Sequence, residues 1–77
     1  MEQNVVLAKR LKELMEVKGI SFGELAQKSG LDARRLHRIA NGGVSNPSVF
    51  VMMRICNGLE VTLDEFFGTE ELKAFAK

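Results

Sequence analysis

Three arginines and the one histidine of the chain lie close together in the sequence, at Arg34, Arg35, His37 and Arg38. An arginine side chain carries a planar fork of N–H donors that matches O6 and N7 of guanine and also the oxygens of a phosphate. On a helix, the apolar Leu36 and Ile39 would face a core while the basic residues face outward. The segment therefore predicts a helix with one buried side and one strongly basic side, suited to binding nucleic acid.

The charge of the chain is distributed unevenly. The net charge is only +1, but residues 1–54 hold nine Lys or Arg and five Asp or Glu, a balance of +4. Residues 55–77 hold two Lys or Arg and five Asp or Glu, a balance of −3. A nucleic acid responds to the local field more than to the net charge, so this pattern predicts a basic face and a separate acidic end.

The reactive side chains argue against an enzyme. The chain has one histidine, one cysteine and no tyrosine. It lacks a Ser/His/Asp set, a glycine-rich phosphate loop and the spacing of a metal site. One cysteine excludes an internal disulfide and a cysteine-based zinc site, and we expect Cys56 to pack as a small apolar residue. We therefore expect no cofactor, no metal and no small-molecule ligand.

The size and composition predict one small domain. The chain has 77 residues, of which 45% are hydrophobic and 27% charged, as in a compact globular protein. Its longest apolar run, residues 49–53, is far too short to span a membrane, and the amino terminus does not resemble a signal peptide. We expect a cytoplasmic protein with a single domain at 1–77, a core at about 5–68 and a C-terminal tail at 69–77.

The first half of the chain predicts three helices. Apolar residues at helical spacing predict an amphipathic helix over residues 5–18, which Gly19 ends. Ser21 and Glu24 form a capping box that begins a second helix, and Gly30 supplies the left-handed turn after it. Asp32 is the expected N-cap of a third helix, which continues to residue 40 or 41. Ala26 would lie where the second and third helices cross, and this short pair predicts a helix-turn-helix.

The second half predicts two further helices. Pro47 suits the first turn of a fourth helix, whose buried side would consist of Val49, Met52, Met53, Ile55, Cys56 and Leu59. Thr62 and Glu65 form a second capping box, which begins a fifth helix that ends at Phe67. Residues from Thr69 onward would form a sixth turn or fray. No alternation long enough for a strand is present, so the fold class is all-α, with five helices.

An ordered set of short motifs resembles a known family. The motifs are Leu7-x-x-Arg10-Leu11-x-x-Leu14, Gly19-Ile20-Ser21, Glu24-Leu25-Ala26, Gly30-Leu31, Ile39, Gly42, Asn46-Pro47-Ser48 and Val61-Thr62-Leu63-Asp64-Glu65-Phe66-Phe67. Together they resemble the phage Cro/repressor-type helix-turn-helix family, which has the lambda-repressor-like fold. The resemblance covers about residues 7–67 and implies a partner, double-stranded DNA.

The resemblance also implies which residues would touch DNA. The positions that reach base edges in relatives are occupied by Ala33, Arg34, His37 and Arg38. Of these, Arg34 and Arg38 carry the strongest expectation of base readout, because a lone surface histidine is often incidental. Arg35 would instead contact phosphate or pair with Asp32.

A second set of residues is expected to contact the phosphate backbone. Free N–H groups at the start of the second helix, on Phe22 and Gly23, form a site for a phosphate. The complete predicted set is Ser21, Phe22, Gly23, Lys28, Arg35, Gly43, Ser45 and Asn46.

The chain departs from the family pattern at several positions. Phe22 stands where relatives often carry a glutamine or similar polar residue that contacts phosphate. A buried Arg–Glu pair common in relatives maps onto Met15 and Ala40, so both halves are apolar and no charge is left unpaired. The loop after the third helix is poor in cations, and Phe50 occupies a position that is usually polar and exposed.

Two functions remain open from the sequence. The first is a sequence-specific transcriptional regulator, a repressor that binds a palindromic operator as a homodimer. Its dimer interface would involve Phe50, Phe67, Leu72 and Phe75. The alternative is a protein-interaction module, such as the antitoxin of a toxin–antitoxin pair, and it is favoured by Phe22, Phe50 and the cation-poor loop.

Overall fold

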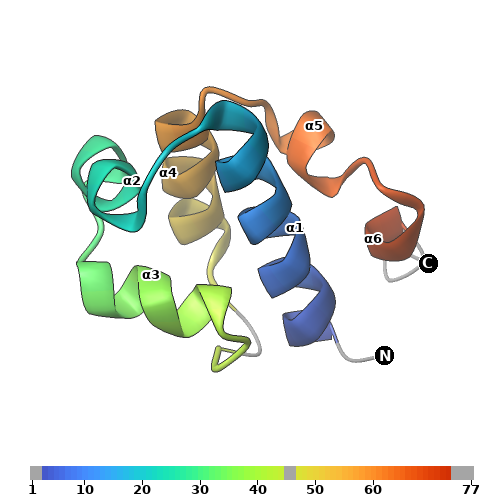
Figure 1. The fold of residues 1–77 in the computed structure, drawn as a ribbon. Helices are drawn as coiled ribbons and strands as arrows, with labels where there is room; N and C mark the ends of the chain where they lie inside the picture. Colours follow the sequence, from blue (N-terminus) through green and yellow to red (C-terminus); the bar gives the residue numbers. More distant parts are fainter. Residues whose placement is uncertain (1–2, 45–46, 74–77) are drawn as a thin grey trace.

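The computed structural model describes residues 3–44 and 47–73, and in these ranges the chain is entirely helical, without strands. Its six helices are α1 (Gln3–Lys18), α2 (Phe22–Ser29), α3 (Ala33–Ala40), α4 (Val49–Leu59), α5 (Leu63–Phe67) and α6 (Glu70–Lys73). In Figure 1, α2 and α3 lie to one side of α1, and α5 and α6 lie to the other. The expected all-α fold is confirmed, and the sixth turn is a short helix. No helix among the described residues is long and apolar enough to cross a membrane.

Both predicted capping boxes are present. The Glu24 N–H donates to the Ser21 hydroxyl at 3.2 Å, and the Glu24 carboxylate accepts from the Ser21 N–H. The same reciprocal pair joins Thr62 and Glu65 at the start of α5. Each box satisfies backbone donors that a helix start leaves unpaired, which explains why these two short helices begin where the sequence predicts.

The start of α4 differs from the prediction. Pro47 was expected in the first turn, but it precedes the N-cap, Ser48, whose hydroxyl accepts from the Val51 N–H at 3.2 Å. The helix therefore begins at Val49. A serine hydroxyl satisfies an unpaired N–H of the first turn, whereas proline offers no side-chain acceptor.

One apolar core is shared by the five helices α1, α2, α3, α4 and α5. Its buried members are Leu7, Leu11, Leu14, Met15, Leu25, Ala26, Leu31, Leu36, Ile39, Ala40, Met52, Ile55, Cys56, Leu59, Val61 and Phe66. Two residues predicted to be buried on α4 are not, since Val49 is 62% exposed and Met53 is 48% exposed. Met53 lies beside the buried stripe of α4, and Val49 is the first residue of α4, so no other described helix covers either side chain. These two side chains add apolar surface to the outside of α4.

Two helices of the core approach each other closely at Gly58 on α4. A Cβ atom there would lie 2.8 Å from Leu25 Cδ1, 3.2 Å from the Ser29 backbone nitrogen and 3.3 Å from Ser29 Cβ. Both neighbours are on α2, and Ser29 is itself buried. Only the absence of a side chain at Gly58 lets α2 pack this close to α4.

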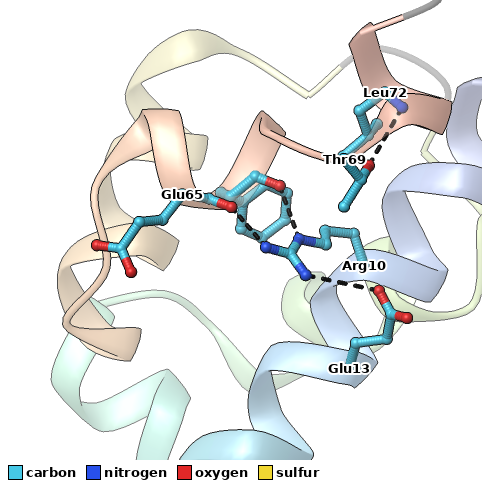
Figure 2. Close-up of polar contacts among 6 residues, drawn as sticks. Arg10, Glu13, Glu65, Thr69 and Leu72 are labelled. Atoms are coloured by element: carbon cyan, nitrogen blue, oxygen red, sulfur yellow. Dashed lines mark hydrogen bonds and ion pairs between the residues drawn. The ribbon is translucent and has the colours of Figure 1, made fainter.

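Arg10 ties α1 to the end of α5. Its guanidinium donates from Nε to the Phe66 carbonyl at 2.8 Å and from Nη2 to the Glu65 carbonyl, while Nη1 lies 3.7 Å from Glu13 Oε1 (Figure 2). The two carbonyls belong to the last turn of α5, where helical partners are missing. A positive charge also suits the carboxyl end of a helix. Arg10 therefore acts as a C-terminal cap for α5, supplied from another helix.

We expect Gly58→Ala to lower the free energy of unfolding by about 1–2 kcal/mol, because forced overpacking outweighs the gain in helix propensity. Gly23→Ala is the matched control. A Cβ at Gly23 would meet only Ser21 Oγ, at 4.0 Å, so this change should stabilise by up to about 1 kcal/mol. Urea unfolding followed by far-UV circular dichroism measures both. A Gly58→Ala protein as stable as the wild type would contradict the close approach.

We expect Arg10→Met to lower the free energy of unfolding by about 1–2 kcal/mol, because two carbonyls lose their donor. Arg10→Lys should recover only part of the loss, since an ammonium group lacks the fork that spans both carbonyls. The control is Lys12→Met, which removes an exposed cation from the same helix and should change stability by less than about 0.5 kcal/mol. Equal effects of Arg10→Met and Lys12→Met in urea unfolding would exclude the capping role.

Candidate nucleic-acid interface

The segment from α2 to α3 has the geometry that the sequence predicts. Gly30 adopts a left-handed conformation, with φ 72°, and its N–H donates to the Ala26 carbonyl. The Asp32 side chain then accepts from the Arg34 N–H at 2.8 Å and begins α3. Ala26 is buried between the helices and the core. The turn between α2 and α3 is therefore short and held at both ends by hydrogen bonds.

The two sides of α3 differ sharply. Leu36, Ile39 and Ala40 are buried in the core, with at most 2% of their surface exposed. All the residues predicted to contact DNA on this helix are exposed: Ala33, Arg34, Arg35, His37 and Arg38. The core packing thus orients α3 so that its basic side faces solvent.

The exposed side of α3 carries two distinct clusters. One is the arginine cluster, Arg34, Arg35 and Arg38, which lines a surface hollow together with Asp32. Three guanidinium groups beside one carboxylate leave a local excess of positive charge, which attracts phosphate and the acceptor groups of guanine. The structure therefore places Arg35 with the two arginines predicted to read bases.

The other cluster is an aromatic pair between α2 and α3. The rings of Phe22 and His37 are stacked, with their centroids 4.2 Å apart and an angle of 24° between their planes. Phe22 is half-buried and packs against the core, whereas His37 is exposed. Sequence reasoning missed the role of Phe22 in placing His37, because the contact depends on how the two helices lie relative to each other.

The amino end of α2 provides the predicted backbone donors, but its side chains are engaged. The Ser21 hydroxyl accepts from the Glu24 N–H and lies 3.2 Å from the Glu24 carboxylate. The first two N–H groups of a helix, here those of Phe22 and Gly23, have no partner within the helix. A phosphate on this helix end would therefore bind mainly through these two backbone groups.

Lys28 lies away from the arginine cluster. It lines a small hollow formed by residues of α1, α2, α4 and their adjoining turns, among them Lys18, Gly58 and Glu60. The structure does not bring this predicted phosphate contact together with the basic residues of α3.

The loop after α3 is fixed to the start of α1. Gly42 has φ 75°, and its carbonyl accepts from the Asn4 side-chain amide. The Gly43 N–H was predicted to donate to phosphate, but it donates to the Arg38 carbonyl at 2.8 Å. Ser45 and Asn46 lie outside the described residues. Nothing in the sequence pointed to Asn4, since its partner lies far along the chain.

The residues predicted for a dimer interface differ in exposure. Phe50 is 74% exposed and lines a surface hollow with Met53 and Leu63. Phe67 is half-buried and packs against the core beside Phe66. Leu72, in contrast, is only 8% exposed, so the chain itself covers it and little of it is left for a partner. Phe75 lies outside the described residues.

Other chemistry is not assembled in the described part of the chain. Cys56 is buried, and burial raises the pKa of its thiol, so it stays protonated and weakly reactive. Among residues 3–44 and 47–73, no group of three or more His, Cys, Asp or Glu side chains is placed to hold a metal ion.

Comparison with known proteins agrees with this geometry. Residues 10–71 match the family model described as a Cro/C1-type HTH DNA-binding domain. Over 55 residues, the chain is 38% identical to the HTH-type transcriptional regulator SlrR of Bacillus subtilis (strain 168). That match covers 71% of this chain and 36% of SlrR, so the chain corresponds to little more than a third of that regulator. No solved structure matches the chain significantly.

Proposed function

The chain belongs to the Cro/C1-type helix-turn-helix DNA-binding domain family, and we propose that it regulates transcription by binding a palindromic DNA operator as a homodimer. Repression is the simplest outcome, because occupancy of an operator by itself blocks other proteins from the same DNA. The similarity to SlrR, which is described as a transcriptional regulator, supports this proposal.

The observation that carries the proposal is the exposed arginine cluster on α3. The helix is fixed on its other side by three buried residues and at its start by the Asp32 cap. A rigid helix with outward guanidinium groups fits the major groove, where arginine pairs with O6 and N7 of guanine. We assign base contacts to Arg34 and Arg38 and a phosphate contact to Arg35.

Phosphates on either side of the groove would fix the orientation of α3. Backbone N–H groups at Phe22 and Gly23 are the donors at the start of α2. Contacts of this kind add affinity but no sequence preference, so specificity rests on side chains of α3.

A dimer follows from the limits of one recognition helix. A single helix reads only a few base pairs, and relatives of this type read two half-sites about one DNA turn apart. An apolar surface suited to pairing lies on α4 and α5, where Phe50, Met53 and Leu63 are 74%, 48% and 38% exposed. We name these three residues the α4–α5 patch. Apolar side chains gathered in this way often mark an interface.

The same patch supports a second candidate, a protein-interaction module such as an antitoxin. In that case a different protein would cover the patch, and the arginine cluster would carry no sequence preference. Selection from a random duplex DNA library, at low and moderate salt, separates the two candidates. Enrichment of a palindrome supports the regulator, and its absence at both salt concentrations supports the interaction module.

We expect Arg34→Ala to weaken binding to the selected operator by about 1–3 kcal/mol and to relax the preference at a particular base pair. The matched variant is Arg35→Ala, which should weaken all sequences alike and reduce the slope of log K against log salt by about 1. Competition binding with single-base operator variants measures both effects. If Arg34→Ala weakened all sequences equally, Arg34 would be a phosphate contact.

We expect Phe50→Glu to shift the protein from dimer to monomer and to weaken binding to a full palindrome, because a charge would be buried in the apolar interface. Val17→Glu is the control, because Val17 is 77% exposed on α1, outside the α4–α5 patch. Sedimentation at micromolar concentration follows the oligomeric state. A wild-type monomer that binds both half-sites without cooperativity would overturn the dimer.

A further inference from the structure

The stacked rings of Phe22 and His37 are the one aromatic contact between the two helices of the helix-turn-helix among the described residues. Phe22 is the first residue of α2, and its ring packs against the core on one side. His37 lies on the exposed side of α3. The phenyl ring therefore supports the imidazole from below, between the core and solvent.

This support limits the freedom of the imidazole. Stacking at a centroid distance of 4.2 Å covers one face of the ring, while the nitrogen atoms lie on its edge. An imidazole has at least one N–H donor whatever its tautomer or charge. A side chain already held in place loses less conformational entropy when it binds, so its hydrogen bond contributes more to affinity and selectivity.

The neighbour of His37 on the same stripe of α3 is Ala33. The two residues are four apart, so they lie one above the other on the helix surface. A methyl group leaves room for a base pair to approach the imidazole, and it also suits contact with the methyl group of thymine. This stripe thus presents one hydrogen-bonding edge beside two apolar side chains, Phe22 and Ala33, next to the arginine cluster.

We propose that Phe22 and His37 form a second recognition element, in which His37 reads one base pair of each half-site and Phe22 is its positioning residue. This inference rests on the proposed DNA-binding function. His37 donates to a purine acceptor in the major groove, and Ala33 packs beside it. Phe22 sets the preference at that base pair through the ring stack, and its side chain makes no polar contact with DNA.

The test measures binding to every single-base variant of the selected operator. His37→Ala and His37→Phe should each reduce discrimination at the same base pair by about tenfold, and His37→Phe retains a ring for the stack. Phe22→Leu, which keeps an apolar side chain against the core, should reduce discrimination at that base pair as well. Phe22→Tyr retains the ring and should preserve the preference.

The double variant Phe22→Leu/His37→Ala should discriminate no worse than His37→Ala, because Phe22 acts through His37. Proton NMR gives an independent readout, since the imidazole protons of the wild type should show a ring-current shift that Phe22→Leu removes. Unfolding curves of each variant confirm that it is folded. A uniform loss of affinity in Phe22→Leu with unchanged base preference, or unchanged preference in both His37 variants, would overturn the proposal.

The controls separate this inference from the proposed function. If the wild type enriches no sequence from the library, the proposed function itself fails. If the wild type selects an operator and Arg34→Ala alters its base preference while the Phe22 and His37 variants do not, only the second recognition element is excluded.

Discussion

The close approach of α2 and α4 at Gly58 is the constraint on which the rest of the structure depends. No side chain separates the two helices there, so Leu25 and the backbone at Ser29 lie directly against α4. The short turn through Gly30 then leaves α3 little freedom relative to α2. Core packing on α3 fixes its rotation as well, so the direction of the basic side depends in part on the contact between α2 and α4, which lie next to each other in Figure 1. A small residue at a helix crossing thus positions a surface that it does not touch.

The exposed residues of α3 fall into two clusters because of the side chains that lie beside them, and the sequence of α3 alone does not show this division. The arginine cluster faces solvent beside the Asp32 cap, whereas His37 leans on Phe22 of α2. The two clusters differ physically. The arginine side chains are long, charged and flexible, so they can reach either phosphate or guanine. The imidazole of His37 is short and held in place by the stack. Phe22 replaces the polar residue that the family pattern places there, and its ring instead completes the packing between the helices.

Arg10 shows how a charge counted in the basic half of the sequence is used within the fold. Its guanidinium closes the last turn of α5 and lies beside Glu13 (Figure 2). One of the positive charges of α1 therefore joins α1 to α5. The remaining contrast is between the arginines of α3 and the acidic first turn of α5, and these two helices lie on opposite sides of α1 in Figure 1.

The sequence by itself determined the local features: the two capping boxes, the left-handed turn at Gly30, the helical segments and the buried stripe of α3. These depend on residues within one or two turns of each other, so periodicity and caps reveal them. The tertiary structure alone decided the Gly58 crossing, the Arg10 cap, the tether from Asn4 to Gly42 and the stack of Phe22 on His37. In the structure Met53, which was expected to be buried, is exposed, and Leu72, which was expected at a dimer interface, is buried. Each of these depends on how separate helices lie against one another, and side-chain spacing within a helix carries no information about that geometry.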